Sequence, residues 1–132
     1  MQIINLTPHT VVVAADFNSS RVEFPSEGIA RVTTSATKID TVNGIEIVAT
    51  TYGEVEGLPE PVSGVVYLVS MVVGNVPAIK LRPDVLCPDT SPQAAVRYPN
   101  GYIVGGTMEG GVKVGGKDMS GMIYAVTRFT KY

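Results

Sequence analysis

The chain contains one histidine and one cysteine, so imidazole or thiol chemistry would have to involve His9 or Cys87. His9 lies in the segment NLTPHT, where it could act as a general base or contact a ligand together with Thr7. The alternative is a structural hydrogen bond in a proline-stiffened link between two strands. Cys87 could pair with His9 as a nucleophile, but no third orienting group can be identified, and a lone cysteine is usually a small buried hydrophobe. We therefore assign no catalytic residue.

The densest polar segment is LRPDVLCPDTSPQAAVR, which carries Arg82, Asp84, Asp89, Thr90 and Arg97. An arginine offers a planar fork to phosphates or carboxylates, and Asp and Thr can bond a ribose or a base edge. This segment is our candidate binding site for a small ligand. The alternative is an Arg–Asp pair and an Asx-type turn that pin a long loop.

Glycine pairs recur every five residues in the C-terminal third, at 105–106, 110–111 and 115–116, and Ser120-Gly121 follows them. Tight turns of hairpins, or a flap over residues 105–121, would explain this spacing. A sharper hypothesis is that successive N–H groups at Gly110 and Gly111 form a nest for a phosphate.

A phosphate-binding loop is a poor match to this segment. Gly111, Gly116 and Lys117 fit the G-x-x-x-x-G-K spacing, but Asp118 replaces the required Ser or Thr. The following SGMIYAVTRF is typical of a strand, whereas the motif needs a helix N-terminus. We do not expect a nucleotide triphosphatase.

Two glutamates in TYGEVEGLPEP, Glu54 and Glu56, would share one face of a strand because they are two residues apart. Such a pair could hold a metal or act in acid–base chemistry. An exposed, solvated acidic edge is the simpler interpretation, since isolated carboxylates rarely leave water. No metal and no cofactor is expected.

The elements that must position these residues are predominantly strands. Fourteen glycines and nine prolines divide the 132 residues into short segments rich in Val, Ile and Thr. This pattern predicts one mainly β domain over residues 1–132, a small barrel or sandwich of about nine short strands with at most one short helix. The expected strands are 2–6, 10–14, 21–24, 29–33, 45–52, 65–73, 102–104, 112–114 and 122–129.

Two Asn-Gly pairs predict hairpins, because both residues tolerate positive φ. Asn43-Gly44 separates TKIDTV from IEIVATTY, and Asn100-Gly101 separates AAVRYP from YIVGG. Residues 70–80 are equally compatible with helix and strand, since Gly74 and the valines weaken a helix that Pro77 would end.

The composition argues against several classes of partner. The net charge of −2 gives no electrostatic footprint for a nucleic acid polymer. The longest apolar run, residues 65–73, is far too short to cross a bilayer, and MQIINLTPHT does not resemble a secretory signal. We expect a cytoplasmic protein with no membrane partner.

Four segments carry a family resemblance: INLTPHTVVV, GIEIVATTYGEVEGLPEP, VVYLVSMVV and RPDVLCPDT. In these segments the chain resembles a group of small uncharacterised proteins of phages, prophages and actinobacteria. The resemblance covers most of residues 1–90, and the glycine-rich segment and final strand are additions to the family pattern. It implies a phage or mobile-element accessory protein of no assigned activity. The matching polar positions, without roles, are Asn5, Thr7, His9, Thr50, Thr51, Glu54, Ser70, Arg82, Asp84 and Asp89.

These observations lead us to expect a non-enzymatic, homo-oligomeric accessory protein of the host-cell cytoplasm. It would bind and sequester a small phosphorylated metabolite or nucleotide-derived host defence signal between the loop 82–90 and the glycine-rich flap. One alternative is a virion structural or protein-interaction module that pairs exposed strands such as 122–129 with neighbours. Another is a small hydrolase or lyase that uses His9 with Asp84 or Glu54.

Overall fold

The computed structural model describes residues 1–132, except for the side chains of residues 112 and 113. The chain divides into two compact units. Unit 1 comprises Met1–Thr10, Phe24–Pro88 and Thr130–Tyr132, and unit 2 comprises Val11–Glu23 and Asp89–Phe129. Strands hold 48% of the residues and helices only 6%, so the predicted mainly β class is confirmed, although the sheets do not close into a barrel.

The strands are more numerous and generally shorter than predicted, and there are two short helices where at most one was expected. None of the described helices has the length and apolar character needed to cross a membrane. In chain order the elements are β1 (Gln2–Asn5), β2 (Val11–Ala14), β3 (Arg21–Phe24), β4 (Arg31–Val42), β5 (Ile45–Glu56), β6 (Val65–Leu68), α1 (Met71–Gly74), α2 (Pro77–Lys80), β7 (Val85–Pro88), β8 (Ala95–Arg97), β9 (Ile103–Val104), β10 (Thr107–Glu109), β11 (Val112–Val114), β12 (Lys117–Asp118), β13 (Ile123–Val126) and β14 (Phe129–Thr130).

The helical segment splits in two because of Pro77. A proline pushes the residue before it out of the helical region, and Val76 has φ −60° and ψ 128°. The chain therefore leaves α1, passes through an extended Val76, and restarts as α2 with Pro77 in its first turn. The strand predicted over 65–73 ends at Leu68, because the chain turns into α1 at Met71 with Ser70 as the N-cap.

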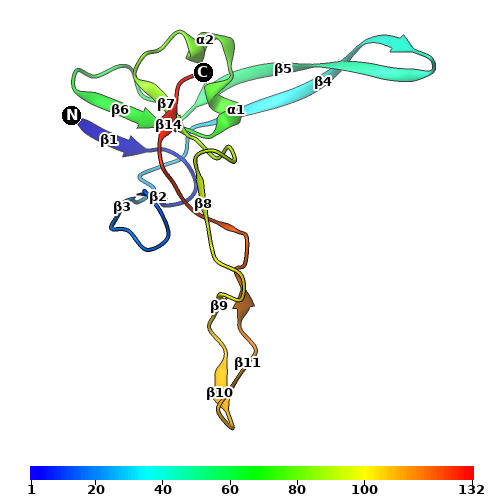
Figure 1. The fold of residues 1–132 in the computed structure, drawn as a ribbon. Helices are drawn as coiled ribbons and strands as arrows, with labels where there is room; N and C mark the ends of the chain where they lie inside the picture. The colour runs from blue at the N-terminus through cyan, green and yellow to red at the C-terminus, as the bar shows by residue number, and fades with distance from the viewer. The chain divides into compact units, whose positions relative to one another are not determined.

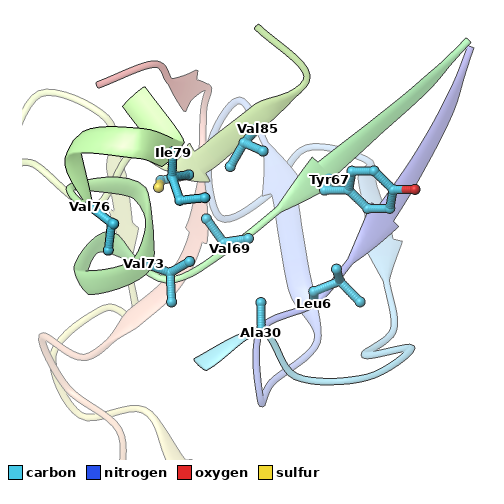
Figure 2. Close-up of a cluster of buried hydrophobic side chains, with 9 residues drawn as sticks. Leu6, Ala30, Tyr67, Val69, Val73, Val76, Ile79 and Val85 are labelled. Carbon is cyan, nitrogen blue, oxygen red and sulfur yellow. The ribbon is translucent and has the colours of Figure 1, made fainter. Parts of the chain in front are cut away.

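Unit 1 is built on a sheet with strand order β1-β6-β7-β14, in which β6 runs parallel to both β1 and β7 (Figure 1). Its core gathers apolar side chains from β6 and β7, from the residues that follow β1 and β6, from the helical segment and from the chain before β4 (Figure 2). The cluster consists of Leu6, Ala30, Tyr67, Val69, Val73, Val76, Ile79, Val85 and Cys87.

The hairpin predicted at Asn43-Gly44 is confirmed. Asn43 has φ 50° and Gly44 has φ 78°, the positive values that a tight two-residue turn needs. The two strands it joins, β4 and β5, are 12 residues each, and Figure 1 shows them running together away from the rest of unit 1.

Unit 2 contains a sheet with strand order β3-β2-β13-β8, and two small antiparallel pairs, β9 with β12 and β10 with β11. The hairpin predicted at Asn100-Gly101 is wrong. A turn is present there, with Gly101 at φ 80°, but β8 pairs with β13 and β9 pairs with β12. The flanking strands therefore find partners further along the chain and not each other.

Candidate functional site

The NLTPHT segment of unit 1 is organised by the side chain of Asn5, which is fully buried. Its Nδ2 donates hydrogen bonds of 2.7 Å to the carbonyl oxygens of His9 and Phe24. Its Oδ1 accepts hydrogen bonds from the backbone N–H of Thr7 at 2.9 Å and from the hydroxyl of Thr7 at 2.7 Å. The segment is therefore a turn fixed by hydrogen bonds, which is the structural alternative to a ligand-contacting role for Thr7 and His9.

The two candidate ligand-contacting residues of this turn differ in what they offer. Thr7 is buried, and the single proton of its hydroxyl has two acceptors, Oδ1 of Asn5 and the carbonyl oxygen of His9, which lies 2.9 Å from Oγ1. The imidazole of His9 is exposed, and the turn engages only its backbone carbonyl. His9 thus presents its side chain to solvent from a fixed backbone, whereas the Thr7 hydroxyl already serves the turn.

Arg82 and Asp84 form a bidentate ion pair in unit 1. Nε and Nη2 of Arg82 donate to the two carboxylate oxygens of Asp84 at 3.0 and 2.6 Å, and Nη1 donates to the carbonyl oxygen of Pro59 at 2.9 Å. The hydrogen bonds from Arg82 lower the pKa of Asp84, which stays ionised at neutral pH. The guanidinium fork that would bind a phosphate is thus directed at groups of the same chain.

Asp89 is the first residue of the second segment of unit 2 and holds it by two contacts. It accepts a hydrogen bond from the backbone N–H of Ser91 at 3.0 Å, and its other oxygen pairs with Nε of Arg128 at 2.7 Å. Hydrogen bonds from Ser91, which contribute most, and from Arg128 lower the pKa of Asp89 to about 2. Thr90 is exposed beside this Asx-type turn. Arg97 donates from Nη1 to the carbonyl oxygen of Gly121 at 2.7 Å.

The glycine pairs of unit 2 fall at the ends of its short strands, which agrees with the hairpin-turn interpretation of residues 105–121. Gly110 and Gly111, at φ 56° and 79°, form the turn between β10 and β11, and no described atom lies within 4 Å of where their Cβ atoms would be. Gly106 and Gly116 sit between the two strand pairs, where a Cβ would press on backbone atoms of the facing strand. The strand expected in SGMIYAVTRF after the failed phosphate-loop match is present as β13, and Lys117 and Asp118 of the match itself lie in β12.

The predicted ligand site draws on both compact units. Thr7, His9, Arg82 and Asp84 belong to unit 1. Asp89, Thr90, Arg97, Gly110 and Gly111 belong to unit 2. Within unit 1 the structure brings Thr7 together with His9 and Arg82 together with Asp84. Within unit 2 it places Gly110 and Gly111 in one turn and Thr90 beside Asp89. The ligand-binding role of the set stays a prediction.

Groups suited to catalysis are sparse among the described side chains. Cys87 is 1% exposed, its Sγ lies 3.6 Å from the carbonyl oxygen of Ser70, and burial raises the pKa of its thiol to about 11. It is therefore a neutral thiol at physiological pH and a poor nucleophile. Glu54 and Glu56 are exposed on β5, and no group of three or more potential metal ligands occurs within the described part of the chain.

An aromatic cluster in unit 2 was not anticipated from the sequence. The ring of Phe17 lies 4.9 Å from that of Tyr124, 5.3 Å from that of Tyr102 and 5.6 Å from that of Tyr98, measured between centroids. Arg21 donates to the hydroxyl of Tyr124 at 2.8 Å, and its guanidinium carbon lies 5.7 Å from the centre of that ring. The rings come from segments about 80 residues apart, so only the spacing of Tyr98 and Tyr102 around a turn could have hinted at it.

The second feature missed is the solvent exposure of the β4–β5 hairpin. Three residues of its two strands, Val32, Ala49 and Val55, are half-buried, and all the others are exposed. The composition of β4, RVTTSATKIDTV, carried the signal, because polar residues occupy both faces of that strand instead of alternating with apolar ones.

One face of the hairpin end is nevertheless apolar. The strand register pairs Val42 with Ile45 and Asp40 with Ile47, so three apolar residues, Val42, Ile45 and Ile47, share a face with Asp40 at its border. We call the three apolar residues the tip face. Ile45 is 69% exposed, and Ile39, an extra residue of β4 beside this face, is 63% exposed. The tip face can therefore make apolar contacts with another molecule.

In comparisons with known proteins, no family model matches the chain, and neither a curated protein nor a solved structure matches it.

Proposed function

We propose that this chain is a protein-interaction module that binds its partner through the β4–β5 hairpin. The observation that carries the proposal is a 24-residue ribbon in which no side chain is buried and whose end presents the apolar tip face. Apolar residues gathered on one exposed face are typical of interaction sites. A protein-interaction module is one of the alternatives expected from the sequence, with residues 122–129 as an example of a pairing strand, and the proposal assigns that role to the hairpin instead.

The energetics of an isolated hairpin support a binding role. Ordering each backbone residue costs roughly 1–2 kcal/mol, and a two-stranded ribbon is marginally stable in water because it buries little apolar surface. The base of the hairpin is anchored, since Val32 and Val55 pack against the core of unit 1. Toward the tip no such support exists within unit 1, and a partner would supply the missing contacts.

The unpaired strand edges add a second mode of recognition. The sheet consists of β4 and β5 alone, so each strand leaves one row of backbone N–H and C=O groups without a strand partner. Such edges can accept an additional strand by main-chain hydrogen bonding. Edge and tip face together offer hydrogen bonds and apolar contacts on a single projecting element.

Site-specific photo-crosslinking tests this proposal. A benzophenone amino acid is placed at position 45, on the tip face, and in a control protein at position 62, an exposed loop position of the same unit. In cells that naturally express the protein, we expect a discrete protein adduct from position 45 only, reduced at least tenfold by Ile47→Lys. Equal labelling from both positions, or no adduct from position 45, would contradict the proposal.

Sequestration of a small nucleotide-derived ligand is a second candidate, and the aromatic cluster of unit 2 favours it. Aromatic rings stack on nucleobases, and a guanidinium next to them can pair with a phosphate. Tyr102 is partly exposed and Arg21 is exposed, so both could reach a ligand. The context of a phage accessory protein acting on a host defence signal follows from the family resemblance alone and is proposed on that basis.

Native mass spectrometry with a pool of nucleotides, cyclic dinucleotides and ADP-ribose tests this candidate. A discrete added mass that returns unaltered on denaturation and disappears in Arg21→Ala would support sequestration. A chemically altered product would favour the hydrolase or lyase alternative instead. An unliganded spectrum at all concentrations up to about 100 µM would rule out ligands of micromolar affinity, the range that corresponds to about −8 kcal/mol.

A further inference from the structure

We propose that the partner of the hairpin is a second copy of this chain, bound antiparallel along the outer edge of β5 with a two-fold axis at Val48. The inference rests on the proposed interaction function and names its partner. Two hairpins joined in this way form one four-stranded sheet in the order β4-β5-β5-β4.

The two edges of the hairpin are not equivalent. In β4 the register shifts between Lys38 and Asp40, so Ile39 is an extra residue that breaks the edge next to two charges. Bulges and charged residues on an edge strand oppose the addition of another strand. The β4 edge is therefore protected against pairing.

The β5 edge has the opposite character over residues 45–52, whose sequence is IEIVATTY. Each residue from Ile45 to Tyr52 is paired with a residue of β4, and no position of β5 is skipped. This stretch of β5 therefore contains no extra residue. The irregularity of β5 comes only at residues 53–54, opposite Thr33. Eight regular residues, most of them β-branched and without glycine or proline, form an edge suited to strand addition.

An antiparallel pairing centred on Val48 is self-complementary. It places Ile47 opposite Ala49 of the second copy, Glu46 opposite Thr50, and Ile45 opposite Thr51, and each pair shares a face because directly opposite residues of neighbouring strands point to the same side of the sheet. Like charges do not meet, because Glu46 is the only charged residue of the stretch. The two copies of Glu46 would lie roughly 14 Å apart along the strands, beyond the screening length of about 8 Å at physiological salt.

The pairing also remedies the weakness of the isolated ribbon. A sheet of three or more strands with an apolar face can be independently stable, whereas two strands are marginal. The tip faces of both copies lie on the same side of the four-stranded sheet, so Ile47 of each copy lies opposite Ala49 and diagonal to Ile47 of the other copy. A second copy therefore satisfies both the exposed edge and part of the exposed apolar surface.

A charge exchange at Val48 tests the inference. Val48 is 51% exposed, so Val48→Lys and Val48→Glu should leave the monomer folded. Sedimentation velocity of the unmodified protein should show a dimer at micromolar concentration. Each variant alone should dimerise at least tenfold more weakly, because like charges then face each other at the axis, and an equimolar mixture of the two should restore the dimer. Thr34→Lys, an exposed substitution on β4, is the matched control and should dimerise normally.

The outcomes separate this inference from the proposed function. A dimer that persists in both Val48 variants, or a mixture that fails to restore it, overturns pairing at the β5 edge. A monomeric protein whose position-45 crosslinker captures a different protein overturns the inference and leaves the interaction function standing. A monomer without any adduct from position 45 overturns both.

Discussion

The side-chain oxygen of Asn5 accepts two hydrogen bonds from Thr7, one from its backbone N–H at 2.9 Å and one from its hydroxyl at 2.7 Å. The amide nitrogen of Asn5 serves two carbonyl oxygens on the other side. The four partner atoms belong to Thr7 and His9, which follow β1, and to Phe24, the last residue of β3. The buried Asn5 side chain therefore connects these segments by hydrogen bonds. This explains physically why the polar residues of NLTPHT occur together.

Replacement of Asn5 by alanine should therefore destabilise the protein strongly. The substitution removes all four hydrogen bonds of the buried Asn5 side chain, and losing a partner at a buried polar group costs about 1–3 kcal/mol. We expect the free energy of unfolding to fall by about 3 kcal/mol in urea titrations. His9→Ala is the control and should change it by less than about 0.5 kcal/mol, because the turn engages only the His9 carbonyl. Equal effects of the two substitutions on the free energy of unfolding would refute this structural role of Asn5.

The sequence predicted the parts of the fold that depend on local chemistry. Asn43-Gly44 forms the expected turn because its positive φ values are an intrinsic preference of these residues. Asn100-Gly101 has the same chemistry, yet its flanking strands pair elsewhere, with β13 and β12. A turn preference fixes the direction of the chain, whereas strand partners depend on long-range packing that residue types do not specify.

The candidate site was predictable at the level of residue pairs. Arg82 and Asp84, two residues apart, are close enough to pair within one segment, and they do. The contact of Asp89 with Arg128 joins residues 39 positions apart, and the aromatic cluster joins Phe17 to Tyr98 and beyond. These contacts depend on how β2, β8 and β13 assemble, so the sequence pattern could not reveal them.

Arg82→Ala should lower stability even in the absence of any ligand. Arg82 binds both oxygens of Asp84 and the carbonyl oxygen of Pro59, and hydrogen bonds to charged groups contribute about 1.5–3 kcal/mol. We expect a loss of about 2 kcal/mol in the free energy of unfolding, measured by urea titration. Arg82→Lys keeps the charge but not the planar fork, so it should recover only part of the loss. Unchanged unfolding with weakened ligand capture would instead indicate that Arg82 is primarily a binding residue.

Asp89 should make the protein sensitive to acid. Hydrogen bonding from Ser91 and from Arg128 lowers its pKa from 3.8 to about 2 in the folded state. A carboxyl whose pKa is depressed on folding stabilises the protein above its unfolded pKa, and this contribution is lost as pH falls toward the folded pKa. The melting temperature of the unmodified protein should therefore exceed that of Asp89→Asn by a constant amount above about pH 5, and the difference should shrink between about pH 4 and pH 2. A difference independent of pH would exclude a contribution from the ionised carboxylate.

Gly74, at the end of α1, is required for packing against β7. A Cβ at this position would collide with Sγ of Cys87 and would lie 3.2 Å from Cδ2 of Tyr132. Gly74→Ala should therefore destabilise the protein by about 2 kcal/mol, despite the better helix propensity of alanine, because overpacking a close contact costs about 1–3 kcal/mol.

A double-mutant cycle with Cys87→Ala isolates the cause of this effect. Removing Sγ eliminates the closest contact, so in the Cys87→Ala background the cost of Gly74→Ala should fall to less than about 1 kcal/mol, and the two effects should not add. The contact with the Tyr132 ring remains and accounts for the residual cost. Urea unfolding of the four proteins gives the coupling energy directly. Strict additivity would mean that the glycine is required for its backbone and not for its approach to Cys87.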